Sequence, residues 1–374
     1  MKRVVLSTGG TGGHIFPALA VAEALRERHP DIDILFIGGS FGQEGRLAKK
    51  AGLEFRALPA RGVLGRGLRS AASVVWLSRS LLKCWFIYRR FKPDLVLGFG
   101  SYAGFVPVLL GTWLGLPAAI HEQNNRPGMT NRILGRRVNR VFLSFPDEKG
   151  YFDPEKVLVT GNPVRKSVLR VAEEEKRYTH QKGCNLLVFG GSQGASAINA
   201  AMIKALPALA SLGIKIVHQS GEAELERMKQ AYGQHGFDQS EVVPFIDNIA
   251  AMYAWSDLVI CRAGASTLAE LTVVGRPSIL IPFPYAVHEH QLTNARFLEQ
   301  AGAAIVLEQS YLDGINLAQV IGDLLALPRQ LQEMGRAAKR LGQPGAVDSI
   351  VDALEELSSE AGGITKNQAV ESRK

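Results

Sequence analysis

Short, continuous runs of apolar residues recur along the chain, and each is followed by a longer segment whose apolar residues lie three or four positions apart. The runs are rich in valine, isoleucine and leucine, which is typical of parallel strands covered by helices on both faces. The pattern therefore predicts an α/β protein. The clearest predicted strands are residues 3–7, 33–38, 94–99, 117–122 and 140–145 in the first half and 185–190, 214–219, 242–246, 257–262 and 277–282 in the second.

The two halves of the chain are built alike. RVVLSTGGTGGHIFPALAVAEAL, residues 3–25, has a counterpart in NLLVFGGSQGASAINAAMIKAL, residues 185–206, and each reads as a strand, a glycine loop and a helix. We predict two Rossmann-like, doubly wound domains with a deep cleft between them that faces the carboxyl ends of both sheets. The expected divisions are a first domain over 1–161, a second over 162–345, a helix over 346–358 that packs back on the first domain, and a disordered polar tail over 359–374.

Composition narrows the class of protein. Hydrophobic residues make up 46% and charged residues 21% of the 374 residues, as in globular proteins. The three cysteines form no C-x-x-C pair, which favours a reducing compartment over a disulfide framework or a zinc site. The chain opens on a strand pattern, so we expect no signal peptide. Residues 95–120 carry no charge, but their glycines and prolines predict strand, loop and helix and not a transmembrane span.

The distribution of the +8 formal charge is more informative than its sum. No acidic residue occurs between Glu54 and Asp94, a stretch that contains many arginines and lysines interleaved with tryptophan and other apolar residues. A basic, aromatic segment of this kind suits an anionic membrane surface. A core-facing helix with a solvated basic side is the alternative. Nucleic acid is not expected, because no nucleic-acid motif accompanies the charge.

Glycine-rich loops follow several predicted strands. GGTGGH at 9–14, GFGSYAG at 98–104 and GGSQGAS at 190–196 each precede a helix, and a further helix begins at GAST, 264–267. Such loops bring backbone N–H groups and the positive end of a helix dipole close to phosphate. None matches the dinucleotide or P-loop motifs. The sequence therefore predicts two phosphate-bearing ligands, with no cofactor and no metal site.

His14 closes the first glycine loop. The ordinary pKa of a histidine, about 6.5, suits a general base or a donor to phosphate, whereas a helix-capping role is the structural alternative.

Motifs that span nearly the whole chain carry a family resemblance. They are GGTGGHIFPALA, GFGSYAGF, HEQNNRPGMTNR, GNPVR, GGSQGA, PFIDNIAAMYAWSDLVICRAGASTLAEL and the segment PFPYAVHEHQLTNA. On these residues the chain resembles the MurG family, bacterial peptidoglycan glycosyltransferases that transfer N-acetylglucosamine from its UDP donor to lipid I, an undecaprenyl-diphosphate-linked muramoyl-pentapeptide. The resemblance implies the GT-B architecture of two Rossmann-like domains.

The resemblance also implies the donor contacts. UDP-N-acetylglucosamine would lie over the helix that begins near Gly264, with its ribose hydroxyls donating to a carboxylate and its diphosphate at helix N–H groups. The implied donor-binding residues are Ala265, Ser266, Thr267 and Leu268 for the diphosphate and sugar-nucleotide, Glu270 for the ribose, the Ile246 backbone for uracil, Ser192 and Arg165 for the phosphates, Gln291 for the sugar, and Thr11, Gly12, Gly13 and Asn124, which close over the donor sugar.

The implied reaction is an inverting displacement, in which the muramoyl C4 hydroxyl attacks the anomeric carbon as UDP leaves. His14 is the first candidate for the base that takes the hydroxyl proton, and Glu122 is the second. A helix dipole together with Arg165 would stabilise the leaving diphosphate without a metal.

The acceptor side would belong to the first domain, whose basic stretch would dock on the cytoplasmic leaflet where the lipid of the acceptor stays. The acceptor diphosphate would meet Gly9, Gly10, Gly98, Gly100 and Ser101. The residues of the membrane patch would be Arg69, Val75, Trp76, Arg79, Leu82, Lys83, Trp85 and Phe86.

Three other functions fit parts of this pattern. A diacylglycerol glycosyltransferase would share the fold and the donor site, but the HEQN and GGTGGH segments favour the peptidoglycan enzyme. A UDP-N-acetylglucosamine 2-epimerase of similar fold would have no use for the basic membrane-facing stretch. A third alternative is a non-catalytic nucleotide-binding or scaffold protein on the membrane, against which the presence of His14 and Glu270 argues.

Overall fold

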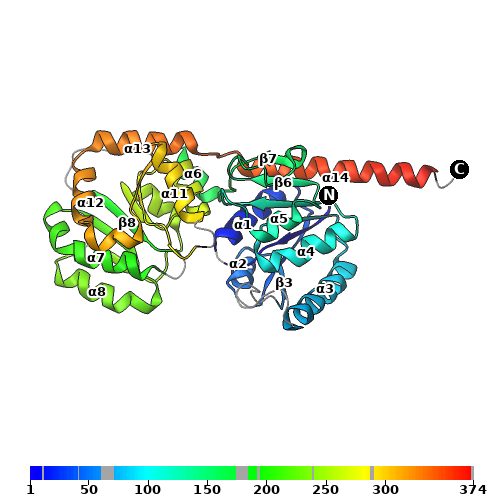
Figure 1. The fold of residues 1–374 in the computed structure, drawn as a ribbon, viewed down its shortest axis with the longest axis horizontal. Coiled ribbons are helices and arrows are strands. Elements are labelled where there is room, and N and C mark those ends of the chain that lie inside the picture. The colour runs from blue at the N-terminus through cyan, green and yellow to red at the C-terminus, as the bar shows by residue number, and fades with distance from the viewer. Residues whose placement is uncertain are drawn as a thin grey trace. The chain divides into compact units, whose positions relative to one another are not determined.

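The computed structural model describes residues 1–10, 12–40, 42–59, 71–173, 184–191, 194–237, 240–286 and 290–371, without the side chains of 71–74 and 362–371. It divides into two compact units, shown in Figure 1: Met1–Arg165 together with the chain from Gly345 onward, and Lys166–Pro344. The sequence placed the first division after residue 161. In the structure it follows Arg165, so the GNPVR segment belongs to the first unit.

The described strands of the first unit form a seven-stranded parallel sheet in the order β3-β2-β1-β4-β5-β6-β7. The strand order changes direction between β1 and β4, so the loops after these two strands diverge to opposite faces at the carboxyl edge of the sheet, where ligands bind in such folds. The elements are β1 Arg3–Ser7, α1 Gly12–Arg28, β2 Asp33–Gly39, α2 Glu44–Lys50, β3 Glu54–Leu58, α3 Ala71–Phe91, β4 Leu95–Gly98, α4 Ser101–Trp113, β5 Ala118–Glu122, α5 Met129–Leu134, β6 Arg140–Leu143, η1 Pro154–Lys156, β7 Val157–Val159 and α14 Ala346–Glu371.

Apolar side chains cover both faces of this sheet, as the continuous apolar runs predict. Val4 and Leu6 of β1 point into a core with α1 and α14, whereas Val5 between them joins a second core with α3 and α4. The alternation follows from the two-residue period of a strand. On the second face the Tyr88 hydroxyl of α3 donates to the Pro107 carbonyl of α4 at 2.8 Å.

The C-terminal helix α14 packs on α1. Ile350 and Leu354 of this helix are fully buried in the core of the first unit. Arg28 at the end of α1 pairs with Asp348 at 2.9 Å and with Asp352. The helix predicted over 346–358 continues to Glu371, so residues 359–371, which the sequence predicted to be disordered, are helical.

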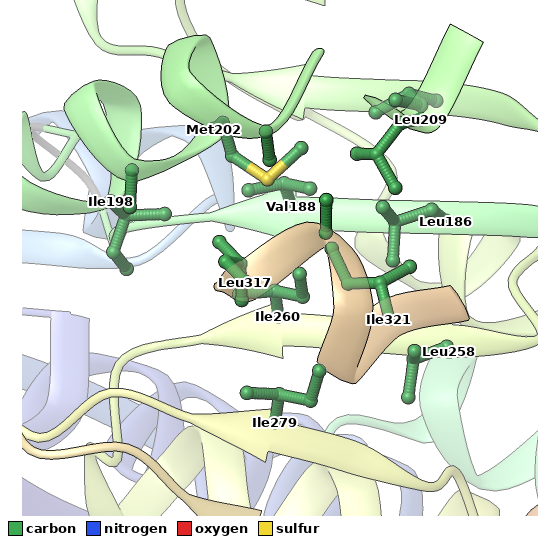
Figure 2. Close-up of a cluster of buried hydrophobic side chains, with 14 of the residues drawn as sticks. Leu186, Val188, Ile198, Met202, Leu209, Leu258, Ile260, Ile279, Leu317 and Ile321 are labelled. Atoms are coloured by element: carbon green, nitrogen blue, oxygen red, sulfur yellow. The ribbon is translucent and has the colours of Figure 1, made fainter. Parts of the chain in front are cut away.

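The described strands of the second unit form a six-stranded parallel sheet in the order β10-β9-β8-β11-β12-β13. Figure 2 shows its core, in which Val188 of β8 and Ile260 of β11 face α7 and α12. The elements are α6 Lys166–Ala172, β8 Asn185–Phe189, α7 Ser196–Leu209, η2 Ala210–Leu212, β9 Lys215–Gln219, η3 Glu222–Glu224, α8 Leu225–Gln234, β10 Glu241–Val243, α9 Ile249–Trp255, β11 Leu258–Cys261, α10 Ala265–Val274, β12 Ser278–Leu280, α11 His290–Gln300, β13 Ala304–Val306, η5 Gln309–Gly314, α12 Leu317–Leu325 and α13 Pro328–Leu341.

The predicted fold class, two doubly wound parallel α/β domains, is confirmed. In the part of the chain that the structure describes, no helix combines the length and the hydropathy needed to cross a membrane, and the predicted elements within 95–120 are β4, α4 and β5.

Candidate functional site

His14 lies in the first turn of α1, which begins at Gly12 and so takes up the second half of the predicted glycine loop. The ring is half-buried, and its Nδ1 lies 2.9 Å from Oε1 of Gln123 in the loop after β5. β1 thus brings His14 to the carboxyl edge of the sheet, and Gln123 in the loop after β5 fixes the orientation of its ring.

Gln123 connects His14 to a buried histidine. The Gln123 Nε2 donates to the Phe99 carbonyl at 3.1 Å and lies 3.2 Å from Nδ1 of His121. The Nε2 of His121 lies 3.1 Å from the Gly161 carbonyl. Burial lowers the pKa of His121 to about 4, so this imidazole is neutral near pH 7. The sequence analysis did not single out Gln123 or His121, although both lie in the HEQN segment.

Glu122, the second candidate base, is buried and saturated with hydrogen bonds. Its Oε1 accepts from the backbone and side chain of Asn124 at 3.0 and 3.2 Å. Its Oε2 accepts from the Gly128 N–H at 3.0 Å and from the Asn131 amide at 2.9 Å. Among the described residues, these four donors occupy the acceptor positions of the carboxylate. The geometry shows a group that organises the loop 123–131.

The first glycine loop is shaped by close contacts. A Cβ on Gly9 would lie 2.7 Å from both the Ala103 Cβ and the Ser101 Oγ, so only glycine fits there. Gly10 has a φ of +88°, and its N–H donates to the Glu44 carboxylate at 2.9 Å. The Gly10 N–H is therefore bonded within the protein, and its expected contact with the acceptor diphosphate stays a prediction.

In the second glycine loop, Gly98 packs against α4, whereas Gly100 and Ser101 lie at the N-terminus of α4. Gly98 is buried, and a Cβ on it would lie 2.5 Å from Val108 Cγ2, so a glycine here allows the close packing of β4 on α4. Gly100 and Ser101 have φ values of +83° and +67°. The positive φ of Ser101 is uncommon for a residue with a side chain. Both residues lie at the N-terminus of α4, where unbonded N–H groups favour an anion.

Arg165 ends the first unit. Its guanidinium lies over the Phe16 ring, 4.3 Å from the ring centroid, and Phe16 in turn lies against Gly12, where a Cβ would come within 2.8 Å of the ring. Arg165, the residue expected to bind the donor phosphates, therefore lies beside the first turn of α1. Its contact, Phe16, is two residues after His14 in the sequence.

In the second unit, α10 begins at Ala265 with Gly264 as its N-cap. Leu268 is buried, and its N–H donates to the Gly264 carbonyl at 3.0 Å. The N–H groups at the start of the helix that can meet an anion are those of Ala265, Ser266 and Thr267, and the predicted contact of Leu268 stays a prediction.

Glu270 lies one turn further along α10 and is held by a residue that the sequence analysis missed. The hydroxyl of buried Tyr253 on α9 donates to Glu270 Oε2 at 3.0 Å. The Tyr253 carbonyl in turn accepts from the buried Arg276 guanidinium at 2.6 Å. A tyrosine eight residues before the start of the CRAGAST segment gave no recognisable signal, because only the fold brings α9 against α10.

Ile246 and Gln291 also lie at the carboxyl edge of the second sheet. Ile246 follows β10 and is half-buried. The side chain of Gln291, at the start of α11, accepts the Phe283 N–H at 3.0 Å and so ties the loop after β12. Arg262 supports the same loop, donating to the Ile281 and Pro282 carbonyls at 3.1 Å, and burial lowers its pKa to about 10.

The exposed face of α3 is both apolar and basic. Val75, Leu82 and Phe86 are more than half exposed, and Arg79 and Lys83 lie among them. Trp76 and Trp85 of the predicted membrane patch are half-buried instead, and Trp85 packs against the core under α3. Helix periodicity divides the segment into these two faces. We call the residues Val75, Arg79, Leu82, Lys83 and Phe86 the α3 face.

Three predicted site residues, Thr11, Arg69 and Ser192, lie outside the described residues. Within the described part of the chain, no three His, Cys, Asp or Glu side chains gather in a way that could hold a metal ion.

Comparison with known proteins adds to this geometry. Residues 4–143 match the glycosyltransferase family 28 N-terminal domain, and residues 185–350 match the glycosyltransferase family 28 C-terminal domain. The UDP-N-acetylglucosamine–N-acetylmuramyl-(pentapeptide) pyrophosphoryl-undecaprenol N-acetylglucosamine transferase of Nitratidesulfovibrio vulgaris strain Hildenborough is 48% identical over 357 residues, 96% of this chain and 98% of the relative.

Solved structures agree with this match. The crystal structure of Acinetobacter baumannii MurG superposes with a TM-score of 0.75 at 32% identity, covering 95% of this chain and 100% of the other. A UDP-N-acetylglucosamine 2-epimerase from Neisseria meningitidis reaches a TM-score of 0.66 at only 14% identity, covering 95% and 100% of the two chains. The epimerase therefore shares the fold alone, whereas the MurG structure shares both fold and sequence over 95% of this chain.

Proposed function

The chain belongs to the MurG family of glycosyltransferase family 28, with its GT-B fold, and from this premise we propose how its residues transfer N-acetylglucosamine. The donor is UDP-N-acetylglucosamine and the acceptor is the C4 hydroxyl of the muramoyl sugar in lipid I. The product is lipid II, for peptidoglycan synthesis. The reaction inverts the anomeric centre, because the hydroxyl attacks opposite the leaving UDP.

His14 is the general base. The observation that carries this assignment is its place in the first turn of α1, where Gln123 holds one ring nitrogen at 2.9 Å. A proton acceptor must lie within hydrogen-bond reach of the attacking hydroxyl, and a half-buried imidazole at the ligand-binding edge meets that requirement. Glu122 does not compete for this role, since its oxygens already accept four hydrogen bonds from described residues.

The second unit binds the donor. The first turn of α10, Ala265 to Thr267, meets the diphosphate with backbone N–H groups and the positive end of the helix dipole. Glu270, oriented by Tyr253, accepts hydrogen bonds from the ribose hydroxyls. The Ile246 backbone meets the uracil, and Gln291 meets the sugar. As negative charge develops on the departing UDP, the N-terminus of α10 stabilises it. Arg165, at the end of the first unit, is a further candidate cation for the phosphates.

The first unit binds the acceptor. Its diphosphate lies at the N-terminus of α4, against Gly100 and Ser101. Gly9 keeps the loop close to α4. Gly12, Gly13 and Asn124 are the residues of this unit that contact the donor sugar.

The α3 face binds the anionic surface of the cytoplasmic leaflet, where the lipid of the acceptor resides. Exposed apolar side chains enter the interface between headgroups and acyl chains, while Arg79 and Lys83 are attracted to anionic lipid. The support for this proposal is the coincidence of both kinds of side chain on one helix of the acceptor-binding unit.

The test is transfer of labelled N-acetylglucosamine from its UDP donor to a lipid I analogue, with a chelator present. The parent should form product, and His14→Ala should lower kcat by ~100-fold or more. His29→Ala, which changes a surface histidine paired with Glu355, is the matched control and should leave kcat unchanged. Conversion of the donor to its 2-epimer, or full activity of His14→Ala, would contradict the proposal.

A further inference from the structure

The hydrogen bonds around His14 form a chain that is anchored on backbone carbonyls. It runs from His14 through the Gln123 amide to His121, and then to the Gly161 carbonyl. A side branch joins the Gln123 amide to the Phe99 carbonyl at 3.1 Å. A backbone carbonyl can only accept a hydrogen bond, so each anchor dictates which atom facing it carries a proton.

The anchor at Phe99 determines which way the Gln123 amide points. Its NH₂ group must face that carbonyl, because the oxygen of the amide would meet the carbonyl oxygen with no proton between them. The amide oxygen is thereby turned towards His14.

The hydrogen bond from His121 to the Gly161 carbonyl independently requires the same orientation of the Gln123 amide. His121 is neutral, because burial lowers its pKa to about 4, and it must donate its single N–H from Nε2 to the carbonyl. Its Nδ1 is then an acceptor and needs the donor that the Gln123 NH₂ supplies at 3.2 Å. Both anchors therefore leave Oε1 of Gln123 as an acceptor for His14.

We propose that Gln123 is a positioning residue that holds His14 in the Nδ1–H tautomer and leaves Nε2 as the nitrogen that accepts the proton. This inference rests on the proposed role of His14 as base. Within the described part of the chain, Nε2 of His14 makes no hydrogen bond. When Nε2 takes a proton, Nδ1–H keeps its bond to Gln123, so no partner has to rearrange.

The partner of His14 is a neutral amide. A carboxylate at hydrogen-bond distance would favour the imidazolium, whereas an amide orients the ring without adding charge. The other titratable groups near the ring have partners of their own. His121 is neutral, and the Glu122 carboxylate accepts hydrogen bonds from the loop 124–131. The Glu44 carboxylate accepts from the Gly10 N–H, and the Arg165 guanidinium lies over the Phe16 ring.

The direct test is nitrogen NMR of the full chain labelled with ¹⁵N-histidine, with the His14 signals assigned from their loss in His14→Ala. The shifts of the two ring nitrogens report which one carries the proton. We expect Nδ1–H for His14 in the parent and in the control Gln330→Leu, an exposed glutamine on α13. In Gln123→Leu we expect the Nε2–H tautomer to appear. An Nε2–H tautomer in the parent, or an unchanged tautomer in Gln123→Leu, would overturn the inference.

The kinetic test is the dependence of kcat on pH. Gln123→Leu should lower kcat roughly 10- to 100-fold, since a wrong tautomer presents the wrong nitrogen. Gln123→Glu should move the acidic limb of the profile about one unit to higher pH, because the base must be unprotonated to act and the new carboxylate favours its protonated form. An unmoved limb in Gln123→Glu would count against the inference.

These results separate the inference from the proposed function. If His14→Ala keeps its activity while the NMR shows the Nδ1–H tautomer, the base assignment fails and the hydrogen-bond chain stands. If His14→Ala is inactive while Gln123→Leu changes neither tautomer nor kcat, the base assignment stands and the positioning role of Gln123 is wrong.

Discussion

At the scale of single residues, two carboxylates of the candidate site are defined by the donors around them. Glu122 and Glu270 are both buried, and both face groups that other elements supply. Four donors from described residues surround Glu122, whereas Tyr253 holds one oxygen of Glu270. The hydrogen bonds of Glu122 hold the loop 123–131 together, whereas the single bond from Tyr253 orients the Glu270 carboxylate. Each of these two assignments predicts the effect of a substitution.

Glu122→Ala should lower the free energy of unfolding by ~2–4 kcal/mol, because it leaves buried donors of Asn124, Gly128 and Asn131 without an acceptor. Chemical denaturation measures the change. Glu148→Ala, at an exposed position, is the control and should stay within ~0.5 kcal/mol of the parent. A variant that loses kcat at unchanged stability would show instead that Glu122 takes part in the chemistry.

Tyr253→Phe removes only the hydroxyl that donates to Glu270 at 3.0 Å. If Glu270 binds the ribose, its loss of orientation should raise KM for the UDP donor about tenfold, equivalent to a hydrogen bond of ~1.4 kcal/mol. Steady-state kinetics with varied donor concentration measures this. Tyr311→Phe, at an exposed tyrosine, should leave KM unchanged. An unaltered KM in Tyr253→Phe would mean that Glu270 is oriented without it.

At the scale of elements, α3 shows how one helix serves two environments. Cys84 and Tyr88 lie in the core under the helix, and the α3 face lies on the opposite side. Basic residues alone would suit any anion, but apolar side chains exposed beside them suit a lipid surface. The helix is therefore the element on which membrane binding can be tested.

Leu82→Ser combined with Phe86→Ser should weaken binding to vesicles that contain anionic lipid by at least tenfold, since each buried apolar side chain contributes ~1.5 kcal/mol or more. Vesicle sedimentation measures it. Leu212→Ser with Leu327→Ser, at exposed leucines of the second unit, is the matched control. Equal binding by both double variants would exclude the α3 face as the membrane contact.

At the scale of the whole molecule, each unit contains a histidine that folding keeps neutral. Burial lowers the pKa of His121 in the first unit to about 4 and that of His218 in the second to about 3. His218 lies between the Tyr232 hydroxyl at 2.9 Å and Asn199 at 3.0 Å. In the unfolded chain the pKa returns to about 6.5, so below that pH the unfolded state binds more protons than the folded state.

The two histidines should therefore contribute their full stability above pH ~6.5 and lose it as the pH falls towards their folded pKa values. Each should lower the free energy of unfolding by ~1.4 kcal/mol per pH unit in the window from about 6.5 down to about 4. Calorimetry between pH 7 and pH 5 measures the shift, with a repeat at high salt to screen surface ion pairs. Stability that rises towards pH 5 would contradict the assignment.

Much of the fold follows from the sequence, because continuous apolar runs and helical spacing are local signals. The central strands of both sheets were predicted. The strands absent from the prediction, β3, β7 and β13, are short or lie at sheet edges, where partial exposure weakens the apolar pattern. The C-terminal helix was predicted too short, since polar composition does not distinguish a solvated helix from a disordered tail.

By itself the sequence determined the fold class, the family and the glycine-rich segments at strand ends, because each depends on residues that lie close together in the chain or on the order of motifs along it. Only the tertiary structure decided which partners within the protein those residues contact. Gly98 packs against Val108, Gly10 bonds Glu44, and Gln123 joins two histidines. These partners come from distant parts of the chain, and their contacts exist only once parallel strands bring them to one edge of a sheet.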